Sequence, residues 1–131
     1  MIFNQGLKAD INLAREIENL VINKLWDGFE SYICYGGNAL NIYNDSGTRL
    51  YIRLFYEGNG KVIVDLANIN IEEAKRRKGN LTNLISSLIK NKNISKIVIS
   101  SVITNEMHQF CKKHNMKYDK HLETYWIDTG N

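Results

Sequence analysis

The sequence predicts a single α/β domain, built on a mixed and mostly antiparallel sheet with a βαβ crossover and helices on both faces. From residue 29 to residue 71, runs rich in β-branched and aromatic residues alternate with Gly, Asn and Asp turns, a pattern typical of antiparallel hairpins. An amphipathic helix and a continuous apolar run follow, and this order indicates a crossover with parallel outer strands. The 131 residues match the length of one domain, and no linker interrupts residues 1–131.

The N-terminal part of the chain predicts a helix over about residues 10–26, after a short apolar segment at residues 1–3. Apolar residues recur there at spacings of one, three and four, and Asp10 suits the N-cap position. The stripe consists of Leu13, Ala14, Ile17, Leu20, Val21 and Leu25.

Four strands are then expected, at residues 29–35, 39–44, 48–57 and 61–71. Alternation in the third strand places Leu50, Ile52, Leu54 and Tyr56 on one face, and Tyr51, Arg53, Phe55 and Glu57 on the other. The fourth segment is more continuously apolar, as expected for a central strand that is covered on both faces.

The second half of the chain predicts the crossover and a short C-terminal unit. The clearest helical stripe consists of Leu81, Leu84, Ile85, Leu88 and Ile89, and a buried strand at residues 96–103 follows it. Asn105 is expected to cap a short helix with an inner face of Met107, Phe110, Cys111 and His114. Residues 116–128 are expected to form one or two final strands.

The composition excludes several classes of protein. Hydrophobic residues make up 44% of the chain and charged residues 24%, which argues for a globular rather than a disordered protein. Two cysteines are too few for a disulfide scaffold or a four-thiolate site, and no metal is expected. No apolar run approaches the ~20 residues of a membrane span, and residues 1–10 do not have the pattern of a signal peptide, so a cytoplasmic protein without a membrane partner is expected. The net charge of +3 falls short of a nucleic-acid-binding arm.

A basic block, Lys75 to Lys78, ends at Gly79, where the strongest helix begins. The first turn of a helix has unpaired N–H groups and the positive end of the helix dipole, and guanidinium groups add complementary charge. A glycine lets the backbone approach a ligand, so a phosphate or pyrophosphate is the expected guest. Open α/β sheets bind ligands at this junction of central strand and crossover helix. A solvated basic loop is the alternative.

This stretch resembles the acyl-CoA site of the GCN5-related N-acetyltransferase (GNAT) superfamily. In that family a central strand leads into an Arg/Gln-x-x-Gly-x-Gly/Ala loop and then into an amphipathic helix. Here the strand ends in Ile69-Asn70-Ile71, the loop reads Arg76-Arg77-Lys78-Gly79-Asn80-Leu81, and the helix continues from Thr82 to Lys90. Asn105 stands where the family commonly has an asparagine that helps to hold the cofactor, and the resemblance covers about residues 61–118.

The resemblance implies a GNAT-like fold and transfer of an acetyl group from acetyl-CoA to an amine, with catalysis mainly by positioning of the two reactants. It implies that two central strands splay apart and that pantetheine lies along the backbones of Ile69, Asn70 and Ile71. The amides of residues 77–82, with Arg76 and Arg77, would hold the pyrophosphate. The sequence does not distinguish a small-molecule acceptor from a protein amine, and an exposed last strand leaves a homodimer open.

Candidate acids and bases follow from the position of each residue. Glu57, at the end of the strand before the central one, is the preferred general base, and Asp65 within a very apolar segment is the second. Many family members carry a tyrosine that protonates the CoA thiolate, and Cys111 stands in its place. Cys111 is either a nucleophile or thiol acid, or a small packing residue. Tyr118 and Tyr125 border the expected thioester, and each is either a replacement acid or a packing residue.

Two alternatives to the enzyme remain open. Leu81 replaces the usual small residue of the loop and Cys111 replaces the tyrosine, which favours a binding or regulatory module that keeps the fold without turnover. A nucleic-acid- or partner-binding α/β protein, in which the basic block meets the phosphates of a polymer, is the other. Acetyl-CoA binding, measured together with thiol release in the presence of amines, separates the three hypotheses.

Overall fold

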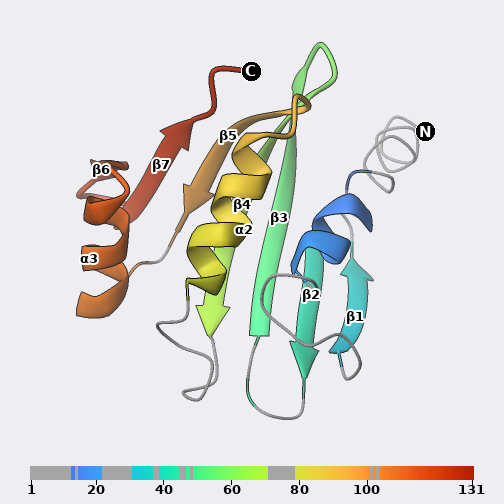
Figure 1. The fold of residues 1–131 in the computed structure, drawn as a ribbon, viewed down its shortest axis with the longest axis horizontal. Helices are drawn as coiled ribbons and strands as arrows, with labels where there is room; N and C mark the ends of the chain where they lie inside the picture. Colours follow the sequence, from blue (N-terminus) through green and yellow to red (C-terminus); the bar gives the residue numbers. More distant parts are fainter. Residues whose placement is uncertain are drawn as a thin grey trace.

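The computed structural model contains a seven-stranded sheet with helices packed against it (Figure 1). The structure describes residues 13, 15–21, 31–36, 39–44, 47, 49–70, 79–100, 102 and 104–131. The apolar segment expected at residues 1–3 and both ends of the expected N-terminal helix lie outside the described residues.

The strands follow the predicted segments closely. They are β1 (Ser31–Gly36), β2 (Ala39–Asn44), β3 (Arg49–Gly58), β4 (Lys61–Asn70), β5 (Ile94–Ile99), β6 (Lys117–Asp119) and β7 (Thr124–Asp128). Their order in the sheet is β1-β2-β3-β4-β5-β7-β6. Among these described strands, only β4 and β5 are parallel neighbours, and α2 (Asn80–Ile89) lies between them in the sequence. The mixed sheet with one βαβ crossover is therefore confirmed.

The described helical residues agree with the predicted helices. Residues 13 and 15–21 are helical, α2 begins directly after Gly79, and α3 spans Asn105–Lys113. The cap of α3 is Thr104, whose hydroxyl accepts a hydrogen bond from the Met107 backbone N–H at 3.2 Å. The prediction that Asn105 is the cap is wrong by one residue, because Thr104 keeps an extended backbone that brings its hydroxyl over the first turn.

A single hydrophobic core lies between the helices and one face of the sheet. Cross-strand pairs such as Leu40 with Ile52, and Ile52 with Leu66, carry this buried face from β2 to β4. The helices contribute Leu13, Ile17, Val21, Leu81, Leu84, Ile85, Leu88 and Cys111. In the view of Figure 1, residues 15–21 and α2 lie in front of the strands. The third strand buries Leu50, Ile52 and Leu54 as predicted.

Tyr56 departs from this pattern, because it is 59% exposed although it was expected beside Leu54. It lies at the hairpin end of β3, where the register shifts between Tyr56 and Gly58. Its hydroxyl accepts a hydrogen bond from the Gly60 backbone N–H instead. The alternation of buried and exposed side chains therefore holds in β3 up to Leu54 and ends where the hairpin turn shifts the strand register.

The opposite face of the sheet is more polar. Arg53 and Asp65 are cross-strand partners there, and Asn41 pairs with Tyr51. The sequence predicted helices on both faces, whereas the described helices pack against the core face only. The polar alternation of β2 and β3 gives a helix little apolar surface to cover on the second face.

The C-terminal strands correct one further expectation. The last strand, β7, lies between β5 and β6, so the free edge at this side of the sheet belongs to β6. A three-residue edge strand offers few backbone groups to a second copy of the chain.

Among the described residues, no helix has the length and apolar character that crossing a bilayer requires.

Candidate functional site

An open stretch of β4 forms one side of the candidate site. Val62 to Leu66 pair with β5, and the last of these pairs joins Leu66 to Ile99. β4 continues to Asn70, where it pairs with β3 on its other edge only. In the described part of the chain, the second edge of residues 67–70 has no strand beside it. Unpaired N–H and C=O groups on such an edge can bind an extended ligand as an additional strand would.

The N-terminus of α2 forms the other side of the candidate site. Gly79 precedes it in a left-handed conformation, with φ 77° and ψ 6°. No side chain caps this terminus, and its first turn has no acidic residue. The N-terminus of α3 differs, because Thr104 caps it and Glu106 lies in its first turn. Among the described side chains, nothing competes with an anion for the first amides of α2.

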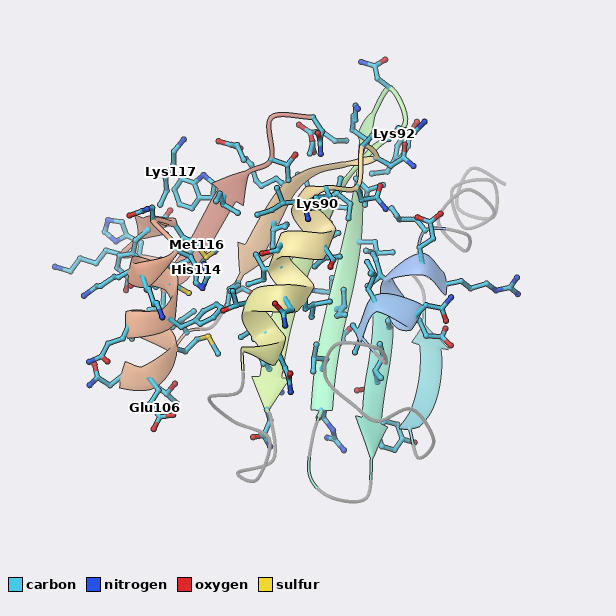
Figure 2. All side chains as sticks on the ribbon, in the orientation of Figure 1. Lys90, Lys92, Glu106, His114, Met116 and Lys117 are labelled. Atoms are coloured by element: carbon cyan, nitrogen blue, oxygen red, sulfur yellow. The ribbon has the colours of Figure 1, made fainter. Side chains whose placement is uncertain are left out.

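The first turn of α2 also contacts α3. Thr82 Oγ1 lies 3.2 Å from His114 Nε2, within hydrogen-bonding distance. Figure 2 shows His114 on the side of α3 that faces α2, with Glu106 at the opposite end of that helix. Thr82, which was expected to bind a phosphate, therefore has a partner within the protein.

The other residues of the expected cofactor site are only partly described. Ile71, Arg76, Arg77 and Lys78 lie outside the described residues. Ile69 packs against the core, and the Asn70 side-chain amide donates to the Gly47 carbonyl at 3.2 Å. Asn80 begins α2, and Asn105 is exposed in the first turn of α3. Leu81 is buried in the core, so its side chain leaves the amide face of the first turn open.

Asp65 is held by two neighbours on the polar face of the sheet. Arg53 donates to Asp65 Oδ2 from Nη2 at 2.6 Å and from Nε at 3.0 Å. The Ser100 hydroxyl donates to Asp65 Oδ1 at 2.8 Å. Each carboxylate oxygen thus accepts a hydrogen bond, which explains why a carboxylate is tolerated at 4% exposure. This arrangement favours a structural role for Asp65 over that of a general base.

Glu57 lies at the other end of the sheet from the open edge of β4. It accepts a hydrogen bond from the hydroxyl of Ser95, the second residue of β5. The strand β4 runs about 30 Å from this end to Asn70. The structure therefore does not bring Glu57 together with the first turn of α2.

A cluster of aromatic and thiol side chains joins α3 to β6 and β7. Tyr125 is 1% exposed, and its hydroxyl lies 3.0 Å from His108 Nδ1. The Tyr118 ring packs on Tyr125 with 4.4 Å between the ring centroids. Burial raises the pKa of the Cys111 thiol to about 12. Burial also raises the pKa of the Tyr125 phenol, with smaller contributions from Cys111 and Tyr118.

The position of this cluster brings Tyr125 close to the open edge of β4. Tyr125 pairs with Ile99, which in turn pairs with Leu66, the last residue of β4 that has a partner in β5. Tyr125 is therefore about two strand spacings, or about 10 Å, from the start of the open edge at the backbone level. The Tyr125 side chain belongs to the hydrophobic core, so its phenol lies on the same side of the sheet as α2.

Sequence reasoning assigned no functional role to His108 or His114, although His114 was expected on the inner face of its helix. Both are partly buried and hydrogen-bonded, to Tyr125 and to Thr82 respectively. One signal was available, because His108 and Cys111 are three residues apart and share a helix face. The hydrogen-bond partners of the two histidines, Tyr125 and Thr82, come from other elements of the fold. No local sequence pattern predicts such tertiary contacts.

Cys111→Ala is expected to lower the free energy of unfolding by about 1 kcal/mol, because it removes one buried side-chain atom from the core. Turnover per folded molecule should stay unchanged, since a thiol with a pKa of about 12 is a poor proton donor at neutral pH. Chemical denaturation and thiol-release kinetics on the same preparation test both statements. A large fall in turnover with intact stability would make Cys111 a participant in the chemistry.

In the described part of the chain, no three His, Cys, Asp or Glu side chains lie close enough together to hold a metal ion. The arrangement instead combines backbone donors, a buried phenol and two imidazoles. These groups suit the binding of an anionic, extended ligand and proton transfer near it.

Comparison with solved structures shows a related fold. The toxin AtaT, in the structure of the AtaT–AtaR complex bound to DNA, matches with a TM-score of 0.50 and 10% identity over 71% of this chain and 69% of AtaT. A mutant AtaT bound to acetyl-CoA and the C-terminus of AtaR matches with a TM-score of 0.48 and 13% identity, over 70% and 68% of the two chains. Naa50 of Arabidopsis thaliana, in complex with the bisubstrate analogue CoA-Ac-MVNAL, gives 0.46 and 15%, over 69% and 70%.

These neighbours are GNAT acetyltransferases. At such identities the likeness establishes the fold, and it confirms the GNAT-like fold that the sequence resemblance predicted. No family model and no curated protein sequence matches the chain.

Proposed function

From its GNAT fold, we propose that this protein transfers an acetyl group from acetyl-CoA to an amine. One observation carries the proposal: the open edge of β4 beyond Leu66 leads toward the uncapped N-terminus of α2 at Gly79. An extended arm with a phosphate group at one end matches both features together. Neither feature alone would distinguish CoA from other anions.

The cofactor is bound in two parts in this proposal. The pantetheine arm lies along the free edge of residues 67–70, where it completes the hydrogen bonding that β5 leaves open. The pyrophosphate lies at the first turn of α2 and receives backbone N–H groups from Asn80, Leu81 and Thr82. Arg76, Arg77 and Lys78 add positive charge there, and Asn105 approaches from α3.

The chemistry follows from the groups around this arm. The amine nitrogen attacks the thioester carbon, the new C–N bond forms and the C–S bond breaks. The amine gives a proton to water, and the departing CoA thiolate needs one. Tyr125 is the proposed donor, because its hydroxyl lies 3.0 Å from His108 Nδ1 and His108 can return the proton through their hydrogen bond. Neither Glu57 nor Cys111 has a part in this scheme.

Thiol release in the presence of acetyl-CoA and a panel of amines tests the proposal. The panel includes a polyamine, a lysine-containing peptide and amino acids, and mass spectrometry identifies the acetylated product. Thiol release that depends on both the amine and the folded protein is the expected result. Tight acetyl-CoA binding without transfer to any amine would contradict it.

One observation favours a second candidate function, a CoA-binding module without turnover. By the family resemblance Cys111 stands where the usual acid would be, and its thiol is buried in the core with no hydrogen-bond partner among the described residues to supply a proton. The Tyr125–His108 pair supports the enzyme over this second function, because a module without turnover has no need of a proton donor beside the thioester.

A further inference from the structure

A shallow pocket lies on the polar face of the sheet, opposite α2. It has a volume of about 400 Å³ and is lined by Asn41, Arg49, Tyr51, Arg53, Ala67 and Asn68. This volume falls in the range of sites for small molecules. The lining residues come from three neighbouring strands, β2, β3 and β4.

The pocket carries an excess of positive charge. Arg53 forms an ion pair with Asp65 at 2.6 Å, which fixes its guanidinium and neutralises it. Arg49 lies four residues before Arg53 on the same face of β3, about 13 Å along the strand, with its guanidinium carbon 5.6 Å from the centre of the Tyr43 ring. No described carboxylate forms an ion pair with Arg49. The pocket is therefore complementary to one carboxylate or a similar anion.

The pocket also contains an unused hydrogen-bond acceptor. Asn41 Oδ1 is buried and has no hydrogen-bond partner among the described residues. A buried acceptor without a partner costs roughly 1–3 kcal/mol, and a bound N–H group would remove that cost. An anion site next to such an acceptor matches the carboxylate and the amino group of an amino acid.

The pocket and the open edge of β4 share residues. Ala67 and Asn68 line the pocket, and both belong to the stretch of β4 that has no partner in β5. Ala67 is the additional residue of a β-bulge, because Tyr51 pairs with Asn68 while Ile52 pairs with Leu66. A ligand with its head group over β2 and β3 therefore reaches β4 across one to two strand spacings, or about 5–10 Å.

We infer that this pocket binds the acceptor of the acetyl group, and that the acceptor is an amino acid or a related molecule with a second amine on its side chain. Arg49 receives the carboxylate, Asn41 accepts from the α-amino group, and the side chain extends over Ala67 to present its amine at the open edge. This inference rests on the proposed function, because it assigns the acceptor of the same reaction. The thioester is reached from the polar face, while the phosphates of CoA lie on the α2 side.

Three probes of similar length separate the elements of this recognition. L-Lysine has both head groups, cadaverine lacks the carboxylate, and 6-aminohexanoate lacks the α-amino group. Binding of each probe to the full chain without cofactor is measured by ligand-observed NMR titration. We expect L-lysine to bind at least tenfold more tightly than cadaverine, with 6-aminohexanoate between them.

The variants Arg49→Gln and Lys90→Gln complete the experiment. Both remove one positive charge from an exposed side chain, but Lys90 lies at the far end of α2 (Figure 2). Arg49→Gln is expected to weaken L-lysine binding at least tenfold and to leave acetyl-CoA binding unchanged, whereas Lys90→Gln changes neither. Equal binding of lysine and cadaverine, or equal effects of the two variants, would overturn the inference.

Transfer assays distinguish this failure from that of the proposed function. Binding of L-lysine that depends on Arg49, without acetylation of any amine, supports the pocket and contradicts the acetyltransferase. Acetylation of other amines by a protein that does not bind L-lysine supports the enzyme and overturns the pocket assignment.

Discussion

Tyr125→Phe is expected to lower the rate of acetyl transfer about 100-fold at saturating acetyl-CoA, which is the lower end of the usual contribution of a positioned proton donor. The substitution keeps the ring that packs on Tyr118 and removes only the hydroxyl that bonds to His108. Loss of that hydrogen bond costs about 1 kcal/mol of stability. Thiol-release kinetics give the rate, and thermal unfolding checks the fold.

Tyr56→Phe is the matched control, because it removes a phenol hydroxyl at the hairpin end of β3, where Tyr56 bonds only to the Gly60 backbone in the described structure. Its turnover should equal that of the wild type. If Tyr125→Phe and Tyr56→Phe have equal rates, Tyr125 is not the acid and the CoA thiolate takes its proton from water.

Gly79→Val is expected to weaken acetyl-CoA binding at least tenfold, which corresponds to about 1.4 kcal/mol. The reason is the backbone, since no described atom lies within 4 Å of a Cβ at this position. A φ of 77° suits glycine, whereas a β-branched residue pays roughly 1–2 kcal/mol to adopt it. The loop is then expected to leave this conformation and to withdraw the first amides of α2 from the phosphates. Isothermal titration calorimetry measures the affinity.

Gly60→Val provides the control for backbone strain. Gly60 has a φ of 74° in the turn between β3 and β4, at the end of the sheet remote from the site. Both variants should lose similar stability, but only Gly79→Val should lose affinity. Unchanged affinity in a folded Gly79→Val protein would show that the phosphates bind elsewhere.

Local patterns in the sequence were sufficient to predict most of the fold. Alternation and Gly/Asn turns located β1 to β4, because each strand buries one face and ends at residues that accept tight turns. The position of β7 between β5 and β6 was not predictable in this way, since the pairing of the last strands depends on contacts far apart in the chain. The covering of a single face by the described helices has the same origin.

The candidate site was less predictable than the fold. Gly79 and the helix behind it have a local signature, and the open edge of β4 follows from the family resemblance. The ion pair of Arg53 and Asp65 was within reach, because both residues lie equally far from the turn at Asn59 and therefore face each other. The same pairing puts Glu57 beside the start of β4, which argues against its predicted role. His108 and Tyr125 meet only through the docking of α3 on β7.

Hydrogen exchange of the wild-type protein with and without acetyl-CoA is the most direct test that the cofactor lies along β4 and at the start of α2. Mass spectrometry of the peptides locates the change in exchange. We expect slower exchange on addition of acetyl-CoA at residues 67–70 and 80–82, and little change in the β3–β4 turn around Gly60. Unchanged exchange in both segments at a saturating concentration of acetyl-CoA, or protection confined to other parts of the chain, would contradict it.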